Sequence, residues 1–128
     1  MPMVLLDSNI VIYMHSAGSD SEVAVNTVAA QVVAVSAISR VETLGFHEIG
    51  REELEALEAF FAVVATFSID DEIIDLAATL RRRHRRMSLG DAIIAATAVS
   101  HGLHLVTRND RDFDMVAGLQ VINPYRTC

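Results

Sequence analysis

The amino-acid sequence predicts an α/β fold in which a parallel sheet is covered by helices on both faces. Two short apolar runs, "MVLL" at residues 3–6 and "LHLVT" at residues 103–107, are typical of buried strands. Between them lie segments with apolar residues at helical spacing. Strands that alternate with helical segments indicate a parallel sheet, because each helix can serve as the crossover between neighbouring strands. The crossovers should be right-handed.

The first part of the chain predicts a strand, two helices and a second strand. The first strand ends at Asp7, which should emerge at its carboxyl end. The Ser- and Gly-rich stretch "HSAGSDSE", residues 15–22, is expected to be a loop that joins two helices. The following helix should lead into a short strand near residues 32–35, after which Ser36 or Ser39 starts another helix.

The middle of the chain predicts two more helices with a brief strand between them. Residues 52–64 carry apolar side chains at helical spacing, and residues 65–68 are expected to form the strand. Asp70 or Asp71 should cap the next helix, which runs towards "RRRHRR" at residues 81–86.

The last part predicts an apolar helix and two strands. The helix should begin at Ser88 and end at Gly102, which is placed at the C′ position. The strand at residues 103–107 follows, and "LQVIN", residues 119–123, is expected to be an edge strand.

Length and composition indicate one domain covering residues 1–128, since 128 residues with 52% hydrophobic content suffice for a single core. No apolar stretch reaches the roughly 18 residues needed to span a membrane, and no basic segment precedes an apolar signal region. We therefore expect a cytoplasmic protein with no membrane partner. The only cysteine is Cys128, which argues against a disulfide framework or a thiolate zinc site.

Charge restricts the possible chemistry. The formal net charge is −7, which repels nucleic acid at long range and argues against a simple phosphate-binding module. All ten basic residues are arginines. The absence of lysine excludes a phosphate-loop lysine and Schiff-base catalysis.

Four acidic residues are predicted to meet at one edge of the sheet. Asp7 and Asp110 follow strands, while Glu42 and Asp91 fall near the starts of helices. In a parallel sheet these positions share the carboxyl edge, where open α/β sheets bind their ligands. Clustered carboxylates repel one another unless a cation is present, and hard oxygen ligands suit Mg²⁺ or Mn²⁺. The pattern therefore indicates a metal site.

Each acid also has a purely structural interpretation. Ser39 with Glu42, and Ser88 with Asp91, have the spacing of a capping box, and Asp7 could cap the helix that follows it. A single acid of this kind is more often a cap. The convergence of several acids favours the functional interpretation.

The motifs "VLLDSNI", "SAISRVETLGF", "LGDAIIAATA" and "LVTRNDRDF" occur in this order along almost the whole chain. These motifs carry a resemblance to the PIN-domain ribonucleases, in particular the VapC-type toxins of toxin–antitoxin pairs. It implies a three-layer α/β/α sandwich with a mainly parallel central sheet, formed by a single PIN-like nuclease domain. By position, Asp7, Glu42 and Asp91 match the family's three acidic residues. The fourth could be Asn109, Asp110 or Asp112, and Asp110 is preferred.

The resemblance further implies a metal-dependent endoribonuclease that acts as the toxin of a toxin–antitoxin pair. One or two Mg²⁺ or Mn²⁺ ions would activate a water for attack on a phosphodiester. The implied partners are RNA, a cognate antitoxin and a second copy of the chain in a homodimer. Five residues are candidates for supporting the acids or positioning the substrate, and Ser8 and Asn9 could equally cap the first helix: Ser8, Asn9, Thr107, Asn109 and Asp112.

Four arginines are candidate RNA contacts. Arg82 and Arg86 belong to "RRRHRR", which is either a solvated helix end or a local anion-binding surface. Arg108 and Arg111 flank the last acidic motif and are the better candidates for contacting the scissile phosphate. The five histidines show no ligand spacing, so zinc is not expected.

Two other functions fit parts of the pattern. A catalytically inactive PIN-like module could bind RNA or protein without cleavage, although the intact set of acids argues against it. A phosphoryl-receiver domain shares the length and the strand-end aspartates, but such domains resemble one another in using a lysine that this chain lacks.

Overall fold

The computed structural model describes residues 3–126, and its five strands form a single sheet. The strand order is β3-β2-β1-β4-β5, and every neighbouring pair is parallel. The predicted parallel α/β sheet is thereby confirmed. The strands are β1 (Met3–Leu6), β2 (Val32–Ser36), β3 (Ala65–Phe67), β4 (His104–Val106) and β5 (Val121–Ile122).

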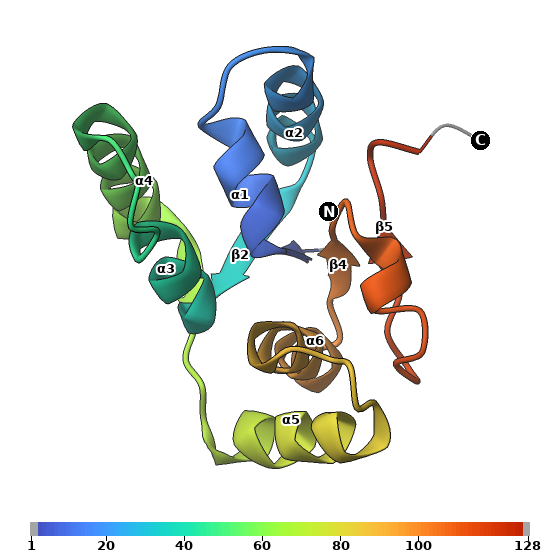
Figure 1. The fold of residues 1–128 in the computed structure, drawn as a ribbon. Helices are drawn as coiled ribbons and strands as arrows, with labels where there is room; N and C mark the ends of the chain where they lie inside the picture. Colours follow the sequence, from blue (N-terminus) through green and yellow to red (C-terminus); the bar gives the residue numbers. More distant parts are fainter. Residues whose placement is uncertain (1–2, 127–128) are drawn as a thin grey trace.

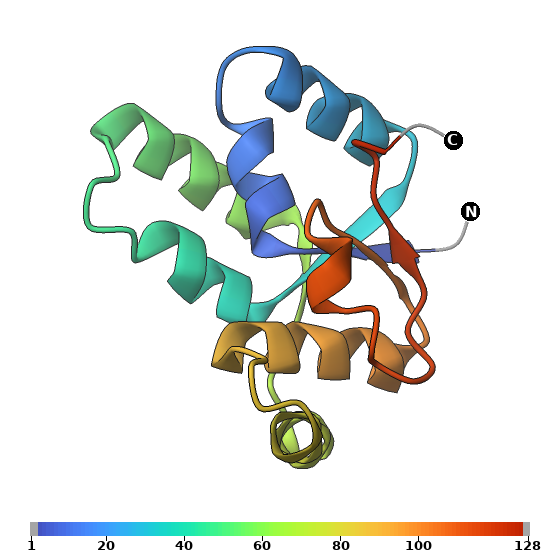
Figure 2. The same ribbon diagram turned by 45° about the vertical axis from the view of Figure 1, so that its right-hand side comes forward.

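Helices cover both faces of this sheet, which gives the three layers of the expected sandwich (Figure 1). Figure 2 shows α6 lying between the sheet and α5, while α1 and α2 lie on the other side. The helices are α1 (Ser8–Met14), α2 (Ser19–Ala29), α3 (Ala37–Leu44), α4 (Arg51–Val63), α5 (Asp71–Arg83) and α6 (Leu89–His101), and a 3-10 turn, η1, covers Asp110–Asp112.

The central strand β1 shows how the sequence produces two cores. Successive side chains of a strand point to opposite faces, so Leu5 packs among residues of α5 and α6. Val4 and Leu6 pack on the other face with residues of α1, α2 and α4. All three side chains are at most 2% exposed. The continuous apolar run is therefore the signature of a strand buried on both faces.

The connection order creates a crevice at the carboxyl edge of the sheet. From β1 the chain continues to β2 and β3 on one side, and later returns to place β4 on the other side of β1. The gap between two strands whose connections leave in opposite directions is where open α/β sheets bind ligands. Asp7 directly follows β1, and Thr107 directly follows β4. Helix α3 contacts both α1 and α6 and closes the crevice from the side.

Several details of the predicted elements differ from the structure. Residues 19–22, expected in a loop, form the first turn of α2, which begins after Gly18 and carries Asp20 and Glu22 near its amino end. Acidic side chains stabilise that end of a helix, and their polarity made the segment look like a loop. The helix caps left open by the sequence are Ser36 for α3 and Asp70 for α5.

The described residues contain no helix long and apolar enough to cross a membrane. Cys128 lies outside the described residues, so the expectation that it forms no disulfide or zinc site stays a prediction. The domain boundaries at residues 1 and 128 also stay predictions.

Substitution of Gly102 tests the backbone conformation at the end of α6. It adopts φ 65° and ψ 34°, the left-handed conformation predicted for C′, and an added Cβ would meet nothing within 4 Å. Gly102→Ala should therefore cost only backbone strain, about 1 kcal/mol of unfolding free energy. Gly102→Asn should recover part of this loss, because asparagine tolerates the conformation better. Urea denaturation of the three proteins measures the effect, and equal stability of Ala and Gly at this position would contradict it.

Candidate active site

Asp7 is the most buried acid of the site, with 5% of its surface exposed. Its two carboxylate oxygens are held from different parts of the chain. Oδ1 accepts a hydrogen bond of 2.8 Å from the backbone N–H of Ser8, and Oδ2 accepts one of 2.7 Å from the hydroxyl of Thr107. The contact with Ser8 shows that Asp7 does cap α1. The contact with Thr107 is one that a simple cap would not need.

Thr107 links β4 to this aspartate. The residue is fully buried, and its hydroxyl oxygen also accepts a hydrogen bond of 3.0 Å from the backbone N–H of Asn109. Donating to Asp7 and accepting from Asn109 fixes the rotamer of Thr107. Of the predicted supporting residues, Thr107 therefore orients the acid directly, whereas Asn109 contributes through its backbone.

Glu42 reaches the same crevice through a pair of serines. The Ser8 hydroxyl donates a hydrogen bond of 2.7 Å to Oε1 of Glu42 and lies 2.9 Å from the hydroxyl of Ser39. Since Ser36 caps α3, Ser39 and Glu42 lie inside the helix, and the capping-box interpretation of this pair is wrong. Ser8 therefore contacts Asp7 through its backbone and Glu42 through its side chain.

Gly90 allows the carboxylate of Glu42 to lie against the start of α6. A Cβ built at this position would overlap Oε2 of Glu42, and Gly90 is buried. In the sequence, the only sign of this contact is that a glycine occupies the second position of "LGDAIIAATA". The glycine permits the close approach of α3 and α6, which places Glu42 near Asp91.

Asp91 lies in the first turn of α6. Its backbone N–H donates a hydrogen bond of 3.1 Å to the hydroxyl of Ser88, the N-cap residue. The capping bond thus uses the backbone of Asp91, and the half-buried side chain belongs to the rim of the crevice.

The acids influence one another electrostatically. Burial raises the pKa of Asp7 from 3.8 to about 6, against the effect of its two hydrogen bonds, and the charges of Asp91 and Glu42 add to the rise. Burial also raises the pKa of Asp91, with further contributions from the charges of Asp112 and Glu42. The four acids that form this electrostatic cluster are Asp7, Glu42, Asp91 and Asp112.

Asp110, the preferred fourth acid, has different partners. Its carboxylate lies 3.0 Å from Nε of Arg126 and accepts a hydrogen bond of 3.2 Å from Nδ2 of Asn123. Desolvation is the largest single influence on the Asp110 carboxyl and raises its pKa, but the hydrogen bond from Asn123 and the charge and hydrogen bond of Arg126 together bring the pKa below its usual value. Neither Asp7 nor Asp91 has its pKa shifted by Asp110. The charge of Asp112, and not that of Asp110, therefore acts on Asp91, which favours Asp112 as the fourth member of the cluster.

The remaining predicted residues fall into different surroundings. Oδ1 of Asn9 is buried without a hydrogen-bond partner among the described residues. Arg108 forms an ion pair of 3.0 Å with Asp20, and its guanidinium lies 4.4 Å from the ring centre of Tyr125. Arg111 is exposed beside the cluster, whereas Arg82 and Arg86 are exposed at the far end of α5 and just beyond it.

The donor set fits a divalent ion in its chemistry. Within residues 3–126, no three His, Cys, Asp or Glu side chains are close enough as they stand to hold a metal ion. Nevertheless, the charges of these carboxylates act on one another, and mutual repulsion contributes, after burial, to the raised pKa of Asp7 and Asp91. A cation would relieve that repulsion, and oxygen donors of this kind suit Mg²⁺ or Mn²⁺.

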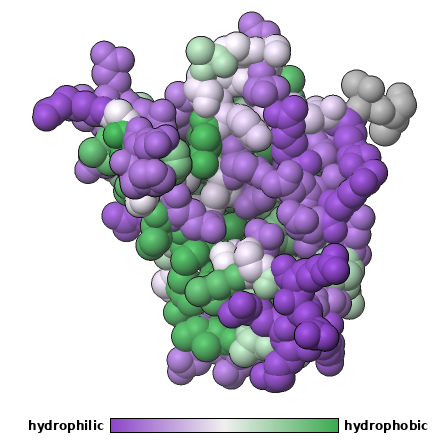
Figure 3. Space-filling model, viewed as in Figure 1, coloured by the Kyte–Doolittle hydropathy of each residue, from purple (hydrophilic) through white to green (hydrophobic). Residues whose placement is uncertain are grey.

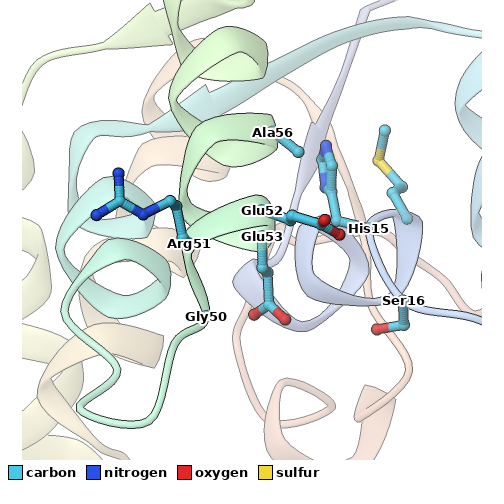
Figure 4. Close-up of a pocket in the computed structure, with 8 residues that line it drawn as sticks. His15, Ser16, Gly50, Arg51, Glu52, Glu53 and Ala56 are labelled. Atoms are coloured by element: carbon cyan, nitrogen blue, oxygen red, sulfur yellow. The ribbon is translucent and has the colours of Figure 1, made fainter.

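One hollow of the surface adjoins the cluster at Asp112, and a larger one lies between α1 and α4. A groove of about 350 Å³ is lined by Arg108, Asn109, Asp110, Arg111, Asp112 and Arg126. A larger cavity of about 710 Å³ separates the end of α1 from the start of α4. Figure 4 shows Glu52 and Glu53 extending from α4, with His15 and Ser16 at the end of α1. None of the four clustered acids lines this larger cavity.

The raised pKa of Asp7 predicts how stability depends on pH. Because the folded-state pKa lies above the unfolded value, the ionised carboxylate destabilises the fold, and the cost grows as pH rises from about 4 through 6. A shift of this size corresponds to about 3 kcal/mol. In chelator, Asp7→Asn should therefore gain stability over wild type between pH 4 and pH 8. Denaturation curves across this range provide the measurement, and a stability difference that does not vary with pH would contradict the electrostatic origin.

Comparison with known proteins places the chain in a family. A model of the PIN domain matches residues 4–119. Ribonuclease VapC10 of Mycobacterium tuberculosis is 33% identical over 121 residues, which cover 92% of this chain and 91% of that protein. Ribonuclease VapC19 of the same organism is 37% identical over 92 residues, covering 69% and 72%.

A solved structure agrees with this assignment. A toxin–antitoxin complex from Klebsiella pneumoniae contains a chain with a TM-score of 0.79 and 29% identity, and the match covers 97% of this chain and 99% of that one. The suspected resemblance is therefore confirmed, and the chain belongs to the PIN-domain family, among the VapC ribonucleases.

Proposed function

We propose that this protein is a metal-dependent endoribonuclease that acts as the toxin of a toxin–antitoxin pair. The observation that carries the proposal is the group of acids at the carboxyl edge of the sheet, in a chain related to VapC ribonucleases. The whole chain would form one nuclease domain and work in the cytoplasm, where its substrate RNA is present.

The acids would bind the catalytic ion or ions. Asp7, Glu42, Asp91 and Asp112 are the proposed ligands, and Asp112 takes the place first given to Asp110. One or two bound Mg²⁺ or Mn²⁺ ions would lower the pKa of a water and stabilise the leaving oxygen of the phosphodiester. Thr107 and Ser8 would keep the carboxylates of Asp7 and Glu42 in fixed orientations, which limits the reorganisation needed on binding.

A cognate antitoxin is the proposed protein partner. The similar chain from Klebsiella pneumoniae was solved in a toxin–antitoxin complex. The cavity between α1 and α4 offers a place for a partner segment, and the excess of its two glutamates over its one arginine favours a basic one.

A homodimer is the proposed assembly of the toxin itself. Val41, Ile74 and Leu89 expose 66%, 50% and 57% of their surfaces on α3, α5 and α6. Figure 3 shows apolar side chains gathered where these helices lie together. A groove of about 260 Å³ on the same face is lined mainly by apolar residues of α5 and α6. Contiguous exposed apolar surface is typical of protein interfaces.

Of the two alternative functions, one is excluded and the other is left to experiment. Membership of the PIN family removes the phosphoryl-receiver interpretation. A catalytically inactive module that binds RNA or protein would keep the fold but show no metal-dependent cleavage, which the following experiment tests.

Purified, antitoxin-free protein should cleave RNA in the presence of Mg²⁺ or Mn²⁺ and not in chelator. Asp7→Asn, Glu42→Gln, Asp91→Asn and Asp112→Asn should each lower the rate by orders of magnitude, because each removes a charged ligand. Thr107→Val, which removes only the hydroxyl that orients Asp7, should cost about 10–100-fold. Mapping of new RNA ends measures cleavage, and full activity of Asp7→Asn would refute the assignment.

The dimer can be tested at Leu89, the first residue of α6. Leu89→Asp places a charge on the apolar face, and an acidic residue in the first turn does not disfavour the helix. Sedimentation should show a dimer for wild type and a monomer for this variant. Val25→Asp is the matched control, because Val25 is also exposed, at 44%, but lies on α2 away from this face. A monomeric wild type, or loss of the dimer in both variants, would contradict the proposed interface.

A further inference from the structure

The groove beside the acid cluster is lined by more arginines than the sequence indicated. Three of its six lining residues are arginines: Arg108, Arg111 and Arg126. Asp112, a member of the acid cluster, also lines it. The groove is therefore continuous with the proposed cleavage site. In a protein of net charge −7, a positive surface here would be needed to hold a polyanion.

Arg108 is already committed to other contacts. Its ion pair with Asp20 and its position against the rings of Tyr13 and Tyr125, 5.2 and 4.4 Å from their centres, satisfy its charge within the fold. Tyr125 in turn donates a hydrogen bond of 2.7 Å to the backbone carbonyl of Asp20. Arg108 thus joins the strand-end loop to α2, and a phosphate would have to displace these contacts to reach it.

Arg126 is held in place but keeps donors for a ligand. Its Nε lies 3.2 Å from Oδ1 and 3.0 Å from Oδ2 of Asp110. Both contacts use Nε, and among residues 3–126 the four N–H groups on the two terminal nitrogens have no further hydrogen bond or ion pair. The Arg126 side chain is 55% exposed, whereas that of Asp110 is only 22% exposed. The anchor is therefore the more buried member of the pair, and the guanidinium faces outward.

The Asp110 carboxylate is itself held in place by Asn123. Nδ2 of Asn123 donates to the Asp110 carboxylate and to the backbone carbonyl of Arg108, which lies 2.9 Å away. Asn123 also accepts a hydrogen bond of 2.9 Å from the backbone N–H of Tyr125. The carboxylate is thus part of a network that joins η1 to the segment after β5. Because this network already orders Asp110 and Arg126, little further conformational entropy is lost when Arg126 binds a ligand.

We propose that Arg126, positioned by Asp110, forms with Arg111 a subsite that binds an RNA backbone phosphate next to the scissile one. The inference rests on the proposed ribonuclease function and names how its substrate is held. A planar guanidinium with free terminal N–H groups matches the geometry of a phosphate. Asp110 then serves as a positioning residue rather than a metal ligand. This role explains why Asp110 is paired with an arginine although it lies close to the acid cluster.

Binding of a labelled single-stranded RNA, measured in chelator over a range of NaCl concentrations, tests the subsite without requiring cleavage. Each phosphate contact on a single strand contributes about −0.7 to the slope of log K against log salt. Arg126→Gln and Arg111→Gln should each make the slope shallower by about this amount and weaken binding several-fold. Arg51→Gln is the control, since Arg51 is exposed at the start of α4 and lines the cavity that none of the four clustered acids lines. It should leave the slope unchanged.

Substitution at Asp110 separates positioning from metal binding. Asp110→Asn keeps an oxygen that can accept from Nε and removes a negative charge, so RNA binding should stay equal or tighten, with kcat on a cleavable RNA preserved. Asp110→Ala removes the anchor and should raise KM several-fold with kcat within about twofold of wild type. A metal ligand would instead lose kcat in both variants, which would overturn the role given to Asp110.

The outcomes also distinguish the subsite from the proposed function. Absence of cleavage by wild type, together with the expected slopes, would refute the ribonuclease and leave the phosphate site standing. Normal cleavage with an unchanged slope in Arg126→Gln, or with an equal change in Arg51→Gln, would overturn the subsite alone.

Discussion

The hydrogen bond between Thr107 and Asp7 is the contact on which the arrangement of the site depends. It joins residues 100 positions apart in the sequence, across the crevice between β1 and β4. The two strands leave the sheet in parallel, so their next residues emerge side by side. A buried carboxylate needs donors on its oxygens, and Thr107 and the backbone of Ser8 supply them. Asp7 is thereby fixed before any ion is present.

Glu42 is brought to Asp7 by helix packing rather than by the sheet. Helix α3 contacts both α1 and α6, and a contact with each neighbour positions the Glu42 carboxylate. On the α1 side Ser8 donates to the Glu42 carboxylate, and on the α6 side Gly90 leaves room for it. The site is thus the meeting point of β1, β4, α1, α3 and α6. Because these elements share the molecule's two apolar cores, the positions of the acids follow from the packing of the whole domain.

The sequence predicted the fold and the main acids because both leave local signals. Apolar runs that stop on a polar residue identify β1 and β4, and the order of motifs places Asp7, Glu42 and Asp91 at one edge. The contributions of Ser39 and Gly90 could not be predicted in this way. Both depend on how closely helices approach, which is set by tertiary packing and not by the periodicity of either helix.

The choice among Asn109, Asp110 and Asp112 was open for a related reason. The three residues lie within one short turn, and a small difference in its path decides which side chain faces Asp91. That path is set by Asn123 and Arg126, more than ten positions later, which draw Asp110 away from the cluster. The same limit applies to the arginines. Arg108 and Arg111 have similar sequence surroundings, yet only Arg108 meets Asp20 and the two tyrosines.

The site combines features that oppose one another energetically. Burial, and after it the repulsion between neighbouring carboxylates, raises the pKa of Asp7 and Asp91, and this costs stability in the absence of a cation. The same acids repel the RNA that the protein is proposed to cleave. Pairing Asp110 with Arg126 addresses both effects, because it neutralises one carboxylate and places a guanidinium in the groove that Asp112 also lines. A fifth unpaired acid would have increased the repulsion. The ion pair therefore limits the unpaired negative charge to the four acids that are the proposed metal ligands.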